Sequence, residues 1–168
     1  MKFIHIVPVK DLYRVRNQEM HMFLAHLIEK YPEYKEFAKN SGGYKILDNS
    51  LIELGEAVEL DRVVKAAEEI SADEIILPDS FLNKNETLKK VIESLEWLHA
   101  YEKAGGKKFK KMAVVHGENE RDWFKCFQLI NTIDYIDVIG IPKVTHKLHS
   151  KGRPYFVNKI LDKTNKEI

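Results

Sequence analysis

Five short apolar runs punctuate this chain, and each is followed by a polar or charged residue. The runs cover residues 3–9, 44–47, 74–78, 112–115 and 135–142. Stretches with apolar residues at helical spacing separate most of them. Alternating strand-like and helical segments are typical of βα units, which join into one parallel sheet through right-handed connections. The pattern therefore predicts an α/β fold with a parallel sheet of successive βα units.

The expected elements follow from these runs and from the spacing between them. Strands are expected over about residues 2–9, 44–48, 74–78, 111–116 and 135–141, and helices over about 16–30, 33–40, 60–71, 85–104 and 120–131. Five βα units do not fill an eight-stranded barrel. The sheet is therefore either open or a shortened, incomplete TIM-like (β/α) barrel. We expect the segment 145–168 to be a polar C-terminal tail.

Composition limits the class of protein. The 168 residues are 44% hydrophobic and 32% charged, which predicts one domain, 1–168, with a sizeable core. The net charge of +1 gives no strong overall attraction to nucleic acid. A single cysteine, Cys126, excludes an internal disulfide framework and a cysteine-rich zinc site. No apolar stretch approaches the length of a membrane span, so we expect a cytoplasmic protein with no membrane partner.

Three side chains at the ends of successive strands are the first candidates for a site. Asp48, Asp79 and His116 directly follow apolar runs. Ligands of parallel β/α sheets bind at the carboxyl ends of the strands, so we expect these side chains to converge on one pocket. Asp48 could act as a general acid or base. The competing interpretation is that each aspartate only closes a turn after its strand.

Neighbours of these residues add to the candidate site. Gly117 lets the backbone approach a ligand closely, and the imidazole of His116 can donate or accept a hydrogen bond near neutral pH. Lys143 follows the fifth run and is expected at the same edge of the sheet. A metal could use the same carboxylates and imidazole, but the spacing matches no metal motif. There is also no Walker loop and no Gly-x-Gly-x-x-Gly motif, so we expect neither metal nor cofactor.

A basic segment lies just after the fifth run. Residues 146–153 carry histidines, lysines and an arginine, close to the expected ligand-binding edge. Such a segment could hold phosphate groups of a nucleotide or a nucleic acid. The alternative is an ordinary solvated loop.

Four segments of the chain stand in an order that matches a known pattern. They read Ile-Leu-Asp-Asn-Ser at 46–50, Ile-Leu-Pro-Asp at 76–79, Val-Val-His-Gly-Glu at 114–118 and Ile-Gly-Ile-Pro at 139–142. Their order resembles the tRNA-guanine transglycosylase (queuine tRNA-ribosyltransferase) superfamily, above all its small phage-encoded relatives. The resemblance spans about residues 44–143. It implies a (β/α)8-type barrel that exchanges a guanine-type base at an N-glycosidic bond.

The resemblance also implies roles for single residues. Asp48 resembles the aspartate of the family's Asp-Ser-Gly-Gly-Phe-Gln motif, which touches the reacting base. Asp79 resembles the aspartate that reads the Watson–Crick edge of the base, and His116 stands where the family has a base-reading glutamine. Gly140 lies close to the later Gly-Gly-Leu segment, whose backbone contacts the base.

This chain also departs from the family pattern, which leaves the function open between three classes. Asn49-Ser50-Leu51 replaces the segment with two glycines after the first aspartate, and no residue resembles the family's nucleophilic aspartate. The first hypothesis is an enzyme acting on a nucleobase or nucleoside at its glycosidic bond. The second is a non-catalytic protein of phage origin that sequesters a nucleotide, and the third is a nucleic-acid-binding protein that uses the 146–153 loop. An incomplete barrel would leave exposed sheet edges, so we also expect a homodimer.

Overall fold

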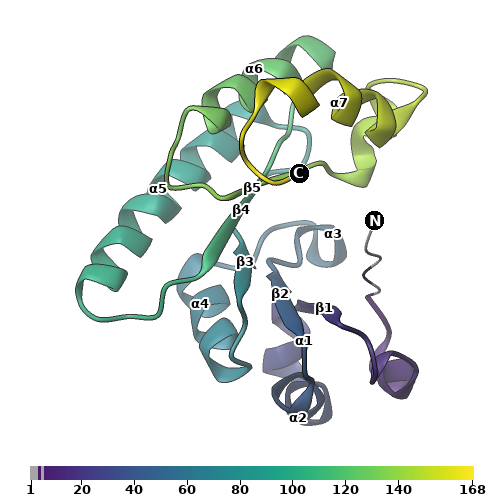
Figure 1. Ribbon diagram of the computed structural model, residues 1–168, viewed down its shortest axis with the longest axis vertical. Coiled ribbons are helices and arrows are strands. Elements are labelled where there is room, and N and C mark those ends of the chain that lie inside the picture. Colours follow the sequence, from purple (N-terminus) through teal and green to yellow (C-terminus); the bar gives the residue numbers. More distant parts are fainter. Residues whose placement is uncertain (1–3, 5) are drawn as a thin grey trace.

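A single parallel sheet organises the protein, as the computed structural model shows for residue 4 and residues 6–168 (Figure 1). Its five strands follow one another in the order β1-β2-β3-β4-β5, and every neighbouring pair is parallel. The strands are β1 (Met20–Leu24), β2 (Tyr44–Asp48), β3 (Glu74–Ile76), β4 (Lys110–Val114) and β5 (Val138–Gly140). This confirms the predicted α/β fold. Because β1 and β5 are the two ends of the sheet, the TIM-like arrangement is partial and not closed.

Helices alternate with the strands. The α-helices are α1 (Ala25–Lys30), α2 (Pro32–Asn40), α3 (Leu51–Leu54), α4 (Leu60–Glu69), α5 (Lys84–Lys103), α6 (Glu120–Asn131) and α7 (Gly152–Ile160). The 3-10 helices are η1 (Val9–Val15), η2 (Lys143–Lys147) and η3 (Leu161–Lys163). Asn83 and Asn119 cap the N-termini of α5 and α6, each accepting a backbone N–H three residues later. None of the helices described is long and apolar enough to cross a membrane.

The two faces of the sheet differ. Alternate residues on each strand point to opposite faces, and one set is almost completely buried in the core that the strands share with α1, α2, α4, α5 and α6. This set includes Phe23, Leu47, Ile75, Ala113 and Ile139. On the opposite face, several residues remain partly exposed, namely Met20, Met22, Tyr44, Met112 and Val114. In a closed barrel this second face would point inward.

The first strand lies elsewhere than the sequence predicts. The expected strand at 2–9 is wrong for the described part of that range, since residues 4 and 6–8 are not in a strand and η1 begins at Val9; residues 1–3 and 5 lie outside the described residues. β1 instead falls inside the helix expected over 16–30. The segment Met20–Leu24 fits the helical period and the strand period equally well. Its apolar residues recur at helical spacing, and in a strand the alternation places His21 and Phe23 on the buried face. Five-residue pairing with β2 decides in favour of the strand.

The segment 145–168, expected to be a polar tail, is folded against the body of the protein. Phe156 and Ile160 of α7 are fully buried. The centre of the Phe156 ring lies 4.4 Å from the centre of the Trp123 ring in α6. Near the C-terminus, Glu167 forms an isolated parallel bridge with Val138 of β5. The backbone of Glu167 therefore occupies part of the outer edge of β5.

Candidate functional site

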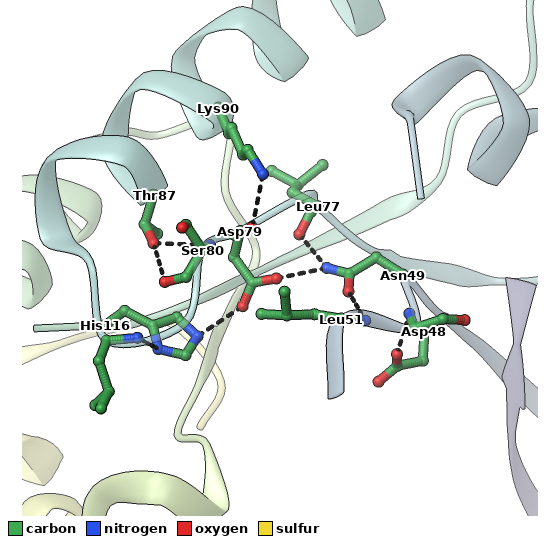
Figure 2. A network of polar contacts seen from close by, with 11 residues as sticks. Asp48, Asn49, Leu51, Leu77, Asp79, Ser80, Thr87, Lys90 and His116 are labelled. Carbon is green, nitrogen blue, oxygen red and sulfur yellow. Dashed lines mark hydrogen bonds and ion pairs between the residues drawn. The ribbon is translucent and has the colours of Figure 1, made fainter. Parts of the chain in front are cut away.

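Asp48, Asp79 and His116 lie at the carboxyl edge of the sheet, after three neighbouring strands (Figure 2). Asp48 is the last residue of β2, Asp79 stands three residues after the end of β3, and His116 two residues after the end of β4. The structure brings Asp79 and His116 into direct contact, with 2.7 Å between Oδ2 and Nε2. Figure 2 shows Asp48 beyond Asn49, which lies between the two aspartates.

The contact between Asp79 and His116 has a defined polarity. The backbone N–H of Leu82 donates to Nδ1 of His116 at 3.2 Å. Since that nitrogen accepts, the ring proton resides on Nε2 and is donated to Asp79. The other oxygen of Asp79, Oδ1, accepts from the side-chain amide of Asn49 at 2.8 Å. Asp79 is thus an acceptor on both oxygens.

Asn49 extends the hydrogen-bond network formed by Asp79 and His116, and contacts with the backbone fix the orientation of its amide. Its Nδ2 also donates to the carbonyl of Leu77 at 2.7 Å, and its Oδ1 accepts the backbone N–H of Leu51 at 3.0 Å. Turning the amide around would break both of these contacts. Asp79 and His116 are only 2% and 1% exposed, so the network is shielded from water and satisfied from end to end. The sequence gives no period or motif that predicts this role for Asn49.

Further contacts hold the loop that carries Asp79. Lys90 of α5 donates to the backbone carbonyl of Asp79 at 3.1 Å. Thr87 of the same helix is bonded to both the N–H and the carbonyl of Ser80, at 3.1 and 3.0 Å. The loop is therefore fastened to the start of α5, and the position of Asp79 is fixed by the helix as well as by its own strand.

The carboxylate of Asp48 has fewer hydrogen bonds than that of Asp79. Its Oδ1 accepts the backbone N–H of Ser50 at 2.6 Å, which is the turn that the simpler interpretation of the sequence expects. Its other oxygen has no hydrogen bond to any described residue. Burial raises the pKa of Asp48 to about 6; the Ser50 hydrogen bond lowers it, and the charges of Glu53 and Asp79 raise it further. The carboxyl group of Asp48 therefore changes its charge close to neutral pH.

Two residues of the site have backbone angles that residues other than glycine rarely adopt. Ser50 has φ 64° and Leu82 has φ 53°, both in the left-handed region. Each of their backbone N–H groups donates to a site residue, Ser50 to Asp48 and Leu82 to His116. Strained backbone of this kind is found most often at functional sites. Here these two conformations orient the N–H group of Ser50 toward Asp48 and that of Leu82 toward His116.

The remaining predicted residues lie at the end of β5 or in the segments that follow β4 and β5. Gly117 is buried, and a Cβ on it would come within 2.3 Å of the backbone nitrogen of Trp123, so its small size serves contact with the start of α6. Gly140, the last residue of β5, lies beside Met112 and Val114 on the partly exposed face. Lys143 begins η2 and is exposed.

Phe81 is a site residue that the sequence reasoning missed. It follows Asp79 by two residues, is 40% exposed, and its ring centre lies 6.3 Å from that of His116. The ammonium of Lys147 in η2 lies 5.3 Å above the same ring. An exposed aromatic ring with a nearby cation can stack on a flat ligand. A large apolar side chain in a loop after a strand is the signal that could have identified it.

The metal search and the comparisons with known proteins both give negative findings. Among the described residues, no group of three or more His, Cys, Asp and Glu side chains could hold a metal ion. No protein-family model matches this chain, and no curated protein matches its sequence.

Proposed function

We propose that the carboxyl edge of the sheet binds a guanine-type nucleoside and that Asp48 acts as the acid/base group at its N-glycosidic bond. One observation carries this proposal. Asp48 keeps a carboxylate oxygen that bonds to no described residue, while the adjoining Asp79 and His116 are held rigidly by protein contacts. A free functional group beside a fixed polar scaffold is the arrangement that positions a substrate for general acid/base chemistry.

The chemistry fits a carboxyl group with a pKa near 6. Hydrolysis of the nucleoside breaks the bond between the sugar C1′ and the base nitrogen, and the bonding electrons leave with the base. Protonated Asp48 would supply the proton that the departing base needs. Water would then add to C1′ and pass one proton to the Asp48 carboxylate, which restores its protonated form. A pKa close to the working pH lets one group give up its proton and regain it in each cycle.

The backbone at Ser50 supports the resemblance to tRNA-guanine transglycosylases. Ser50 falls at the first of the two glycines in the family motif, and its φ of 64° is one that glycine adopts without strain. The conformation of Ser50 is therefore compatible with a glycine at this position of the motif. No residue of this chain resembles the nucleophilic aspartate of the family. We therefore propose that water accepts the sugar when the base departs.

The base-reading role of Asp79 belongs to the same proposal, and His116, whose two ring nitrogens are both bonded, would orient Asp79 toward the base. Both oxygens of Asp79 already accept from protein donors, Asn49 on one side and His116 on the other. A guanine-type base would have to replace the Asn49 amide with its own N–H group. Asp79 would then still accept from two donors, Asn49 would keep its hydrogen bond to the carbonyl of Leu77, and Phe81 would offer a stacking surface beside the base.

Chromatography of a reaction mixture tests the catalytic claim. Guanosine is incubated with the wild-type protein, with Asp48→Asn, and with Asp134→Asn, an exposed aspartate outside the site. The proposal expects free guanine from the wild type and the control variant, and none from Asp48→Asn. Equal release of guanine by all three proteins would show that Asp48 has no catalytic role.

A second candidate function is binding without catalysis. The cation of Lys147 above Phe81 supports it, because a stacked base and a bound phosphate together hold a nucleotide. In this case guanosine or its 5′-phosphate returns intact from the same incubation, while calorimetry still detects binding. If the basic segment 146–153 contacts nucleic acid, binding of a DNA or RNA strand should weaken steeply with added salt.

A second copy of this chain is the protein partner that we propose. β1 and β5 are the end strands of the sheet, and Glu167 pairs with only one residue of β5. Free strand edges favour pairing with another chain, and two-fold symmetry is the commonest outcome. Sedimentation at micromolar concentration should show a dimer; a monomer alone would contradict this proposal.

A further inference from the structure

We propose that His26 is a further ligand-binding residue and that it binds a hydroxyl group on the sugar of the nucleoside. The inference rests on the proposed function and adds the orientation of the ligand. The base would lie toward the loops after β3 and β4, and the sugar toward the ends of β1 and β2. The sequence analysis does not single out His26, because it places the first strand at residues 2–9.

His26 belongs to the carboxyl edge because of where β1 ends. Leu24, the last residue of β1, pairs directly with Asp48, the last residue of β2, and His26 follows two residues later in α1. The backbone N–H of His26 donates to Oγ of Ser50 at 3.3 Å. Ser50 in turn donates its own N–H to Asp48. His26 and Asp48 are therefore connected through one fully buried residue.

The ring of His26 has an atom without a partner. Nδ1 is buried, and no described residue forms a hydrogen bond with it. A buried polar atom without a partner costs about 1–3 kcal/mol. By contrast, both ring nitrogens of His116 are bonded. The unpaired nitrogen and the unpaired oxygen thus belong to His26 and Asp48, two residues that both form hydrogen bonds with Ser50.

The electrostatics favour an uncharged ring. Burial lowers the pKa of His26, an effect that the nearby Glu53 partly opposes. The charge of Glu53 also acts on Asp48, so this exposed carboxylate of α3 lies near both groups. A neutral imidazole nitrogen either donates or accepts one hydrogen bond, depending on the tautomer.

A hydroxyl group is the ligand chemistry that suits such an atom best. It both donates and accepts, so it can pair with Nδ1 in either tautomer and with the free oxygen of Asp48. A carboxylate or phosphate only accepts, and it would meet the charges of Asp48 and Glu53 at close range. In a nucleoside, the hydroxyl groups are on the sugar. We therefore place the sugar beside His26.

Calorimetric titration with guanosine and with free guanine tests the orientation. The variants are His26→Phe, which fills the space without a nitrogen, and His26→Asn, whose amide can replace Nδ1. Both keep the backbone N–H that binds Ser50. His99→Phe is the matched control, since His99 is an exposed residue of α5.

The proposal expects His26→Phe to weaken guanosine binding about tenfold and to leave guanine binding unchanged. His26→Asn should recover part of the loss, and His99→Phe should behave as the wild type. An unchanged ratio of the two affinities in His26→Phe would overturn the inference while leaving the proposed function intact. If the wild type binds neither compound, the proposed function fails, and the inference about His26 fails with it.

Discussion

Replacing Asp79 with asparagine probes the polarity of the buried network. Both neighbours of Asp79 donate to it, His116 through Nε2 at 2.7 Å and Asn49 through Nδ2 at 2.8 Å. An asparagine side chain has a single oxygen, so its NH₂ group must face one of these donors. Neither neighbour can reverse, because Leu82 fixes the tautomer of His116 and the contacts of Asn49 to the backbone fix its amide.

The expected loss follows from that conflict. One hydrogen bond to a charged group disappears, which is worth about 1.5–3 kcal/mol, and a buried donor is left without an acceptor. We expect Asp79→Asn to lower the free energy of unfolding by about 2–4 kcal/mol, a large share of the roughly 5–15 kcal/mol typical of domains. Urea unfolding followed by circular dichroism measures the difference.

A matched variant separates this effect from the general loss of a negative charge. Asp162→Asn removes a carboxylate that is exposed and bonds to no described residue, so its unfolding midpoint should stay close to that of the wild type. If Asp79→Asn costs no more than Asp162→Asn, Asp79 is not a charged acceptor between two donors. The account of the network would then be wrong.

Two other predictions concern the same edge of the sheet. Because burial raises the pKa of Asp48 to about 6 from an unfolded value near 4, its ionised form destabilises the fold above about pH 6 and the penalty disappears as the pH falls toward 4. Asp48→Asn should thus be more stable than the wild type at about pH 8, by up to about 3 kcal/mol, with little difference at about pH 4; a difference independent of pH would contradict this. Gly117→Ala should destabilise by about 1–3 kcal/mol, because its Cβ would overlap the backbone of Trp123, whereas Gly42→Ala meets no atom within 4 Å and should be tolerated. Equal thermal midpoints for the two glycine variants would rule out this packing.

The sequence predicts β2 to β5 because each is an apolar run with a clear end. Their parallel pairing follows from the helices between them. The first strand is different, since Met20–Leu24 is apolar in a way that fits a helix and a buried strand equally well. Pairing with β2 is a long-range interaction, and no local pattern contains it. The same holds for α7, where Phe156 is buried against Trp123 of a distant helix.

In the candidate site, too, the local sequence pattern predicts some residues, while others depend on long-range contacts. Placing Asp79 and His116 at neighbouring strand ends was possible from the sequence, and the structure brings them into contact. Asn49 was missed because the direction of an amide depends on which donors and acceptors the fold places around it. His26 was missed because its strand was placed elsewhere along the chain. Single residues are therefore predicted only as well as the strand that carries them.

Calorimetric titration of the wild-type protein with guanosine and with cytidine at about pH 6.5 tests the central claim most directly. The claim is that the edge formed by Asp48, Asp79 and His116 recognises a guanine-type nucleoside. It predicts that guanosine binds and that cytidine, which lacks the donor pattern of a guanine, binds at least about tenfold more weakly. Equal affinity for the two nucleosides, or no heat of binding with either, would contradict it.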